Sequence, residues 1–481
     1  MKPTKEQTKA ITEFETERDV KVIAYAGAGK TSTLVKMAEA DDTRGGLYLA
    51  FNKRIAEEAD AKFPFNVRCS TAHSLACREM RRRYDGGKLF KNPRMIDTNI
   101  GVFGKDLKPG HCRELVARTL RYFMQSNDME ISAKHVPNLE KMGFVVSKAA
   151  AKALKDQIVS NTEHVWAKMI NQRDPFPMGH DGYLKLWAMS KPAIPTDVLF
   201  VDEAQDLNPV LLGVIERQMC QVVSVGDSHQ QIYEWRGAVD ALDKLEGKAC
   251  RLTQSFRFGA TVAAEANRIL RLLGETKPLK GLGADGMVEG YSRDDEDETP
   301  VDAILCRSNG GVIGRTAEAL DGGREVFIPG GVSELLSWVL DAEKLQEGRP
   351  ASPGELMAFT TWEEVKEFSD SVDGSHLAVF VRLVEKFGTD DLRRILNSVL
   401  KTPKPGALTI STTHKAKGLE WDSVKVDEDF MIGRKNNDDG NGKVKVTKAQ
   451  CRLLYVAMTR AKTFLSIPHG IVREYQNAEI I

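Results

Sequence analysis

Apolar positions along this chain form two kinds of pattern: short, mostly apolar runs, and longer segments with an apolar residue every three or four positions. The short runs lie at 22–24, 46–51, 67–71, 197–202 and 221–227. Buried parallel strands are apolar on both faces, and strands that alternate with helices are typical of parallel α/β sheets. The pattern therefore predicts an α/β fold built on parallel sheets.

The first periodic segment predicts a capped helix over Pro3–Phe14. Thr4 is the type of residue that accepts a hydrogen bond from the first turn, and Gln7 lies within that turn. An apolar strand and a glycine-rich turn follow.

Two long helical stretches interrupt the alternation of strands and helices. The first predicts helices over 111–124, 147–160 and 183–190, and the second extends from 333 to 400. A second α/β set is predicted to begin near 250–252, with a helix over 261–273, strands at 303–307 and 326–328, and a last portion over 407–469. The acidic run 294–298 between them is interpreted as a solvated loop.

These patterns predict two α/β domains in tandem, each with a mainly helical insertion. The first domain comprises 1–74 and 197–250, with its insertion at 75–196. The second comprises 251–330 and 404–481, with its insertion at 331–403.

Composition limits the classes of function. The hydrophobic content is 42% and the charged content 28%, as in a globular protein, and Lys+Arg and Asp+Glu both total 68. A net charge of zero gives no global argument for nucleic acid or membrane, so such an argument must be local. The apolar runs are far shorter than the roughly 18 residues of a membrane span, and no membrane partner is expected.

The cysteines and the N-terminus predict a location. Seven scattered cysteines form no Cys-x-x-Cys pair, which argues against zinc and iron–sulfur sites, and the odd number argues against a disulfide framework. Residues 1–4 are polar and begin no signal-peptide core. We therefore expect a reducing, cytoplasmic setting.

The glycine-rich turn at Lys21–Thr33 has the order strand, loop and helix that a phosphate-binding loop needs. Gly27 and Gly29 let backbone N–H groups turn inward, Lys30 can contact the β- and γ-phosphates, and Thr31 can hold Mg²⁺. The helix N-terminus favours the same negative charge. The general pattern has a glycine at the position of Ala24, so the loop alone is an imperfect match.

A second signal for phosphate chemistry lies at 198–206. There an apolar strand ends in Asp202 and Glu203, at the edge of the sheet where α/β proteins bind ligands. Asp202 can hold Mg²⁺, directly or through water, and Glu203 can act as general base on the attacking water. A surface acidic turn is the alternative, but the upstream loop favours nucleoside triphosphate hydrolysis.

A third signal lies at 225–238. Gln230 can sense a γ-phosphate, and Tyr233, Trp235 and Arg236 combine two aromatic rings with a cation. Such a combination suits stacking on the bases of a single strand. A core position for Trp235 is an equally good interpretation from composition.

Together these segments resemble superfamily 1 helicases of the UvrD/Rep/PcrA type, close to the F-box DNA helicase branch without its F-box portion. The motifs occur in order over most of the chain, at Gln7, 26–31, 50–53, 70–74, 202–206, 226–238, 254–257, 412–420 and 454–461. Alanine at position 24 is common in this family. The resemblance implies two RecA-like domains with ATP bound between them.

The resemblance also implies residue roles. ATP and Mg²⁺ would be the cofactors, and the nucleotide would be bound by Gln7 at the adenine edge, Phe256 on the adenine ring, Glu420 at the ribose, and Ala26, Gly27, Ala28, Gly29, Lys30, Thr31 and Ser32 at the phosphates. Arg257 and Arg460 would be arginine fingers, for which planar guanidinium groups are suited. Single-stranded DNA would lie on Phe51, Asn52, His73, Tyr233, Trp235, Arg236, Thr412 and His414.

We therefore expect an ATP-dependent DNA helicase acting on single strands and single/double-strand junctions, with replication or recombination proteins as partners. The resemblance implies 3′-to-5′ movement. One alternative is a translocase that strips bound proteins without processive unwinding. Another is a nucleotide-gated binding protein, although a complete set of hydrolytic residues argues against a mere switch. The basic run 78–83 fits either DNA phosphate or a solvated helix face.

Overall fold

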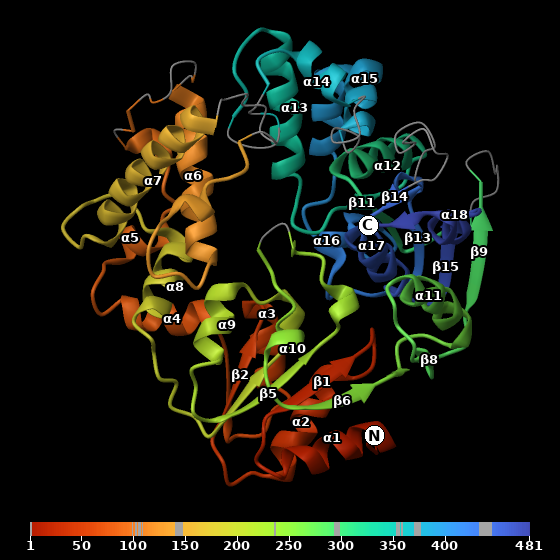
Figure 1. The fold of residues 1–481 in the computed structure, drawn as a ribbon. Coiled ribbons are helices and arrows are strands. Elements are labelled where there is room, and N and C mark those ends of the chain that lie inside the picture. The colour runs from red at the N-terminus through yellow and green to blue at the C-terminus, as the bar shows by residue number, and fades with distance from the viewer. Residues whose placement is uncertain are drawn as a thin grey trace. The chain divides into compact units, whose positions relative to one another are not determined.

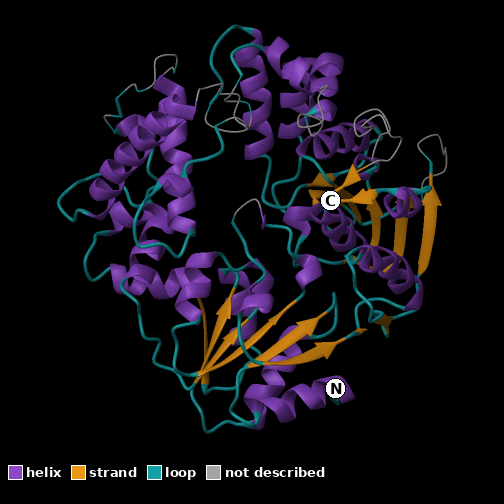
Figure 2. Cartoon of the chain, in the orientation of Figure 1, coloured by secondary structure: helices purple, strands orange, loops and turns teal. Residues whose placement is uncertain are grey.

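The computed structural model describes residues 2–98, 100–101, 103, 107, 109–139, 148–234, 237–292, 299–352, 356, 359–369, 377–431 and 445–481. The chain divides into two compact units, one of Met1–Ala24 with Lys30–Leu252 and one of Tyr25–Gly29 with Thr253–Ile481. Each unit contains a six-stranded sheet (Figures 1 and 2). Within the described residues, no helix has the length and apolar character to cross a bilayer.

The sheet of the first unit is parallel throughout, with the strand order β3-β2-β4-β5-β1-β6. Its strands are β1 (Val20–Ala24), β2 (Gly46–Ala50), β3 (Val67–Thr71), β4 (Val198–Val201), β5 (Gln221–Gly226) and β6 (Lys248–Leu252). The accompanying helices are α1 (Lys5–Phe14), α2 (Lys30–Ala40), α3 (Lys53–Asp60), α4 (Ala72–Met80), α9 (Pro209–Ile215) and α10 (Ala241–Lys244). The predicted parallel α/β architecture is confirmed.

Burial explains why these segments form central strands. Every residue of β4 and β5 is buried, as continuous apolar runs in a sheet covered on both faces require. On one face, a core that includes Leu199 and Leu212 packs the strands against α9 and α10. On the other, the rings of Phe14 and Phe200 lie 5.9 Å apart.

The expected cap of the first helix is confirmed. Thr4 Oγ1 accepts a hydrogen bond from the Gln7 backbone N–H, and the Gln7 side chain accepts one from the Thr4 N–H. The two residues form a capping box, which satisfies two N–H groups that the helix itself leaves without partners.

The prediction that the strand near 250–252 begins the second α/β set is wrong, because this strand belongs to the sheet of the first unit. Pairing of Val20 with Lys248 and of Ala24 with Leu252 makes β6 the edge strand of the first sheet, beside β1. A short strand pattern identifies a strand but not its neighbours, because pairing is decided by the whole sheet. The predicted acidic loop at 294–298 lies outside the described residues.

The first helical stretch follows α4. It contains α5 (Gly86–Phe90), α6 (Pro109–Gln125), α7 (Lys148–Ile170) and α8 (Gly179–Met189), with short 3-10 turns at Met95–Asp97 and Ala133–His135. One apolar core that includes Leu115, Phe123 and Trp166 holds these helices together. The buried Lys185 amine donates to the carbonyls of Ser126 and Asp128, at 2.7 and 2.5 Å, and so fastens the loop after α6.

The sheet of the second unit is also parallel, with the order β11-β12-β10-β13-β15-β9. Its strands are β9 (Met287–Tyr291), β10 (Ala303–Cys306), β11 (Val326–Phe327), β12 (Leu408–Thr412), β13 (Trp421–Val426) and β15 (Ala461–Pro468). Two short pairs are β7 (Gln254–Ser255) with β8 (Lys280–Gly281) and β14 (Lys445–Val446) with β16 (Glu479–Ile480).

Helices of the second unit are α11 (Ala260–Leu272), α12 (Asn309–Asp321), α16 (Thr413–Ala416), α17 (Lys448–Met458) and α18 (Ile471–Asn477). The second helical stretch contains α13 (Ser333–Gln346), α14 (Trp362–Ser369) and α15 (Ala378–Asn397), and the last is kinked at Gly388. A core that includes Val339, Phe380 and Ile410 joins these helices to the sheet. Helices therefore dominate the described residues of 333–400, as expected.

Candidate active site

Lys30 and Thr31 begin α2, and both side chains reach residues that follow β4. The Lys30 Nζ lies 2.8 Å from Glu203 Oε1. The Thr31 hydroxyl donates to Asp202 Oδ2 at 3.3 Å. The carboxyl ends of parallel strands lie at one edge of a sheet, which brings the segments after β1 and β4 together. The structure thus joins the first two signals of the sequence within the first unit.

Asp202 is held by two further donors. The Tyr48 hydroxyl donates to Asp202 Oδ2 at 2.5 Å, and the Glu203 backbone N–H donates to Oδ1 at 2.8 Å. Burial and the adjacent Glu203 charge raise the pKa of Asp202, while Lys30 and Tyr48 act in the opposite direction. The sequence did not indicate Tyr48, which lies in β2 and outside every motif described under Sequence analysis.

The Lys30 amine remains an ammonium group in this setting. Burial alone would lower its pKa, but the carboxylates of Glu203, Asp202 and Asp227 outweigh burial and raise it. A permanently charged amine at the start of a helix suits a phosphate group. Thr31 and Asp202 supply the hard oxygen atoms that Mg²⁺ prefers, so the residues fit the implied metal.

Glu203 has a backbone conformation that few glutamates adopt. Its φ is 49° and its ψ 43°, in the left-handed region. The Gln205 amide donates to the second carboxylate oxygen of Glu203 at 2.5 Å. The turn after β4 therefore directs the carboxylate toward Lys30 at a cost in backbone strain, which is typical of functional positions.

Gln230 and Gln7 are both buried and both hydrogen-bonded in the first unit. The Gln230 amide donates to Asp227 Oδ2 at 2.7 Å, at the end of β5. The Gln7 amide donates to Thr33 Oγ1 at 3.1 Å, in the first turns of α2. Each amide is thus fixed near the segment in which the sequence predicts phosphate or adenine contacts, and those contacts remain predictions.

The loop Tyr25–Gly29 groups with the second unit through its contacts. Gly27 has a φ of +71°, and a Cβ atom on it would lie 2.4 Å from Ser255 Oγ. Its carbonyl accepts a hydrogen bond from the Phe256 N–H at 2.9 Å. The Ala26 N–H donates to the Tyr455 hydroxyl at 3.1 Å. Glycine is required at position 27, and Tyr455 is a contact that the sequence did not indicate.

The two expected arginine fingers differ in their surroundings. The Arg257 guanidinium donates to Glu420 Oε2 at 2.7 Å and to the Thr459 carbonyl at 2.9 Å. Arg460 is 2% exposed and donates to the carbonyls of Val456 and Leu419 at 3.1 and 3.3 Å. Arg460 therefore fastens the end of α17 in this structure, and its role in hydrolysis remains a prediction.

Glu420 is expected at the ribose and has a perturbed acidity. Burial alone would raise its pKa, but Arg257 and Lys462 outweigh burial and lower it. The carboxylate is consequently charged over a wider pH range than an ordinary glutamate, and it pairs with both cations in the second unit.

Comparison with known proteins identifies the family. Residues 7–236 match the model of an AAA domain, and residues 361–469 match the UvrD-like helicase C-terminal domain. The F-box DNA helicase 1 of Gallus gallus is 33% identical over 98% of this chain. The chain belongs to the UvrD-like superfamily 1 helicases. Within them it is near the F-box DNA helicase branch, as the sequence predicted.

Two further relatives agree with this assignment. The F-box DNA helicase protein 1 of Schizosaccharomyces pombe is 29% identical over 95% of this chain, and the ATP-dependent DNA helicase PcrA of Staphylococcus epidermidis is 25% identical over 64%. The chain spans 49% of the Gallus protein, 56% of the Schizosaccharomyces protein and 46% of PcrA. It therefore corresponds to about half the length of these helicases.

The residues that the helicase resemblance assigns to DNA are only partly joined by the structure. Phe51, 47% exposed, lies stacked on Tyr233, with ring centroids 5.8 Å apart and planes at 15°. Asn52 caps α3, because its Oδ1 accepts a hydrogen bond from the Ile55 N–H. His73 Nε2 lies 3.9 Å from Asp181 Oδ1. Trp235 and Arg236 lie outside the described residues.

Thr412 and His414 belong to the second unit. The Thr412 hydroxyl accepts a hydrogen bond from the Lys415 N–H at 3.4 Å, so Thr412 caps the N-terminus of α16. His414 follows in the same short helix and is half-buried. Both positions stay predicted DNA contacts.

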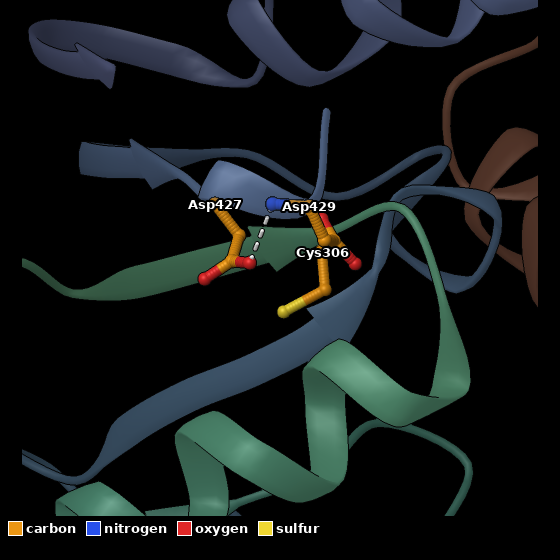
Figure 3. Close-up of side chains that lie close together, drawn as sticks. All are labelled: Cys306, Asp427 and Asp429. Atoms are coloured by element: carbon orange, nitrogen blue, oxygen red, sulfur yellow. Dashed lines mark hydrogen bonds between the residues drawn. The ribbon is translucent and has the colours of Figure 1, made fainter. Parts of the chain in front are cut away.

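One group of metal-binding side-chain types occurs among the described residues, at Cys306, Asp427 and Asp429 (Figure 3). Asp429 accepts hydrogen bonds from the N–H groups of Arg307 and Ser308, at 2.7 and 2.9 Å. Asp427 forms an ion pair with the Arg315 guanidinium. Asp429 thus fastens the start of α12, and Asp427 the middle of that helix, to the segment after β13. We assign the group this structural role.

Proposed function

We propose that this chain is an ATP-driven motor that moves along single-stranded DNA and unwinds duplex DNA, using ATP and Mg²⁺. The observation that carries the proposal is the convergence of Lys30 and Thr31 with Asp202 and Glu203. Membership of the UvrD-like helicases supports the same activity. A bound phosphate alone would require the lysine, but hydrolysis requires the paired carboxylates as well.

Each residue of the convergent group has a distinct task. Lys30 binds the β- and γ-phosphates as a fixed ammonium group, while Thr31 and Asp202 would hold Mg²⁺. When bound, Mg²⁺ neutralises charge that develops on the phosphate oxygens. Glu203 accepts the proton of the attacking water once a phosphate has drawn Lys30 away from it. The Lys30–Glu203 ion pair therefore keeps both groups charged before the nucleotide arrives.

The DNA side of the proposal rests on the stacked pair Phe51 and Tyr233. Base–aromatic stacking tolerates any sequence, as a motor on single strands requires. We further propose 3′-to-5′ movement, action at single/double-strand junctions, an intracellular location and partners in replication or recombination, all from the helicase resemblance.

A first experiment measures ATP hydrolysis with and without single-stranded DNA. We expect strong stimulation by DNA in the native chain and loss of hydrolysis in Lys30→Ala, with Lys62→Ala, an exposed lysine on the same unit, as the control. ATP hydrolysis that DNA leaves unchanged would contradict the motor. Nucleotide binding without hydrolysis in the native chain would favour the nucleotide-gated switch.

A second experiment separates helicase from translocase. Duplexes with a 3′ or a 5′ single-stranded tail are incubated with ATP and Mg²⁺. Unwinding of the 3′-tailed duplex is expected. DNA-stimulated hydrolysis that removes a protein block without strand separation would instead favour the stripping translocase.

A further inference from the structure

The register of the first sheet places one tyrosine beside the predicted metal ligand. Tyr48 in β2 pairs with Phe200 in β4, and Asp202 follows two residues after Phe200. Side chains two residues apart on a strand point to the same face, separated by roughly 7 Å. The long Tyr48 side chain spans this interval, and its hydroxyl reaches Asp202 Oδ2 at 2.5 Å.

Both oxygens of the Asp202 carboxylate are thereby fixed. Oδ1 accepts from the Glu203 N–H at 2.8 Å, and Oδ2 accepts from Tyr48 and, at 3.3 Å, from Thr31. A carboxylate held at both oxygens cannot rotate about its last bond. The lone pair that remains on Oδ1 therefore points in a defined direction, and so does the Oδ2 lone pair that faces the Thr31 hydroxyl.

The burial of Tyr48 suits it to this task. Its side chain is completely buried, and a buried phenol needs a hydrogen-bond partner. Because the Tyr48 hydroxyl is directed at Asp202 Oδ2, we place its effect on a metal at the Asp202 carboxylate.

We infer that Tyr48 is a positioning residue that orients the Asp202 carboxylate for Mg²⁺ in the nucleotide site. This inference rests on the proposed function. Outer partners of metal-binding carboxylates commonly change metal affinity by about 10- to 100-fold when they are removed. The same hydroxyl would have no effect on Mg²⁺ if it served only to stabilise the strand.

The test compares Tyr48→Phe with Tyr84→Phe. Tyr84 also donates its hydroxyl to a partner in the first unit, the Ile170 carbonyl at 2.7 Å, but belongs to the helical stretch. The readout is the affinity for fluorescently labelled ADP, titrated with Mg²⁺ and repeated in EDTA. We expect the Mg²⁺ concentration at half-effect to rise about tenfold in Tyr48→Phe only, with affinity in EDTA unchanged.

A Mg²⁺ dependence equal to that of the native chain in Tyr48→Phe would overturn the inference. If that variant does not fold, 3-fluorotyrosine at position 48 retains the hydroxyl and provides a ¹⁹F resonance. This resonance should shift when Mg²⁺ is added to the ADP-bound protein, and no shift would overturn the inference too. A native chain whose ADP affinity ignores Mg²⁺ would instead contradict the proposed function.

Discussion

Phe51 keeps nearly half of its surface exposed although its ring is stacked on Tyr233. An aromatic residue at the end of a buried strand would normally be drawn into the core. Here β2 ends at Ala50, and Asn52 begins the cap of the next helix, so Phe51 is left in the turn between them. The turn therefore presents a ring that a nucleic-acid base can reach.

Replacing Phe51 tests this interpretation at the level of one side chain. Phe51→Ala should weaken binding of single-stranded DNA by about 1–3 kcal/mol, because base–aromatic stacking contributes that much per base. The Michaelis constant for ATP should change little. Fluorescence anisotropy of a labelled oligonucleotide measures the affinity, and Phe65→Ala, at a ring that is 93% exposed, is the matched control. Equal losses in both variants would remove Phe51 from the DNA track.

At this scale the sequence indicated the polar residues that the structure brings together, but not the side chains that support them. Lys30, Thr31, Asp202 and Glu203 could be found because strand, turn and helix follow one another around them. Tyr48 could not, since its role depends on the pairing of β2 with β4, which are far apart in the sequence. A donor from a neighbouring strand leaves no local pattern.

At the level of elements, the loop after α6 depends on a buried charge. Lys185 is 1% exposed, its amine lies 4.3 Å from the centre of the Phe123 ring, and it donates to two carbonyls of that loop. Burial lowers the pKa of Lys185 to about 8, although Asp128 acts in the opposite direction. One buried amine thus supplies the hydrogen bonds of two carbonyl groups in this loop.

Lys185→Met should destabilise the first unit by about 1–3 kcal/mol, because it leaves buried carbonyls without donors. The pH dependence provides a second readout. The folded chain releases the Lys185 proton at a lower pH than the unfolded chain does, so this residue makes stability rise from about pH 8 toward the ordinary lysine pKa of about 10.4.

Urea unfolding from pH 7 to 10 measures both effects. The variant should lose this part of the rise, whereas Lys152→Met, an exposed position on α7, should keep it. Identical pH profiles for the native chain and Lys185→Met would contradict the assignment.

The boundaries of helices show the limit of what sequence patterns can predict. The pattern placed the last helix of the first stretch at 183–190, but α8 begins at Gly179, which has a φ of +72°. Glycine and aspartate near that start weaken the helical pattern. Glycine is nevertheless suited to position 182, because a Cβ atom there would lie 2.7 Å from the Met178 side chain and 2.9 Å from that of Met169. Tertiary contacts decided the boundary.

At the level of the whole molecule, the predicted hydrolytic residues are distributed over two units. Lys30, Asp202 and Glu203 belong to the first, and Arg257 and Arg460 belong to the second. The helicase resemblance implied this distribution. Lys30 follows β1 and Asp202 follows β4, whereas Arg257 follows the short strand β7 and Arg460 immediately precedes β15. The sequence could not predict that Arg460 is buried, since burial follows from how α17 packs.

Replacement by lysine should have different effects at Arg257 and at Arg460. Arg460→Lys removes hydrogen bonds that one amine cannot replace, and should lower stability by about 1–3 kcal/mol and the unfolding midpoint by several degrees. Arg257→Lys should lower the turnover of ATP more than the midpoint, because planar bidentate contact with phosphate is lost while an amine can still pair with Glu420. Differential scanning fluorimetry with turnover measurements separates the two. An unchanged midpoint in Arg460→Lys would contradict its structural role.

The left-handed backbone of Glu203 has a consequence for how this chain can change. Glycine or asparagine would adopt a φ of 49° with less strain than glutamate does. Selection for heat resistance alone would therefore favour variants that replace this carboxylate, and selection for ATP turnover would restore it. At the Glu203 turn, stability and the proposed catalytic activity therefore favour different residues. The glutamate that hydrolysis requires lowers the temperature at which the chain unfolds.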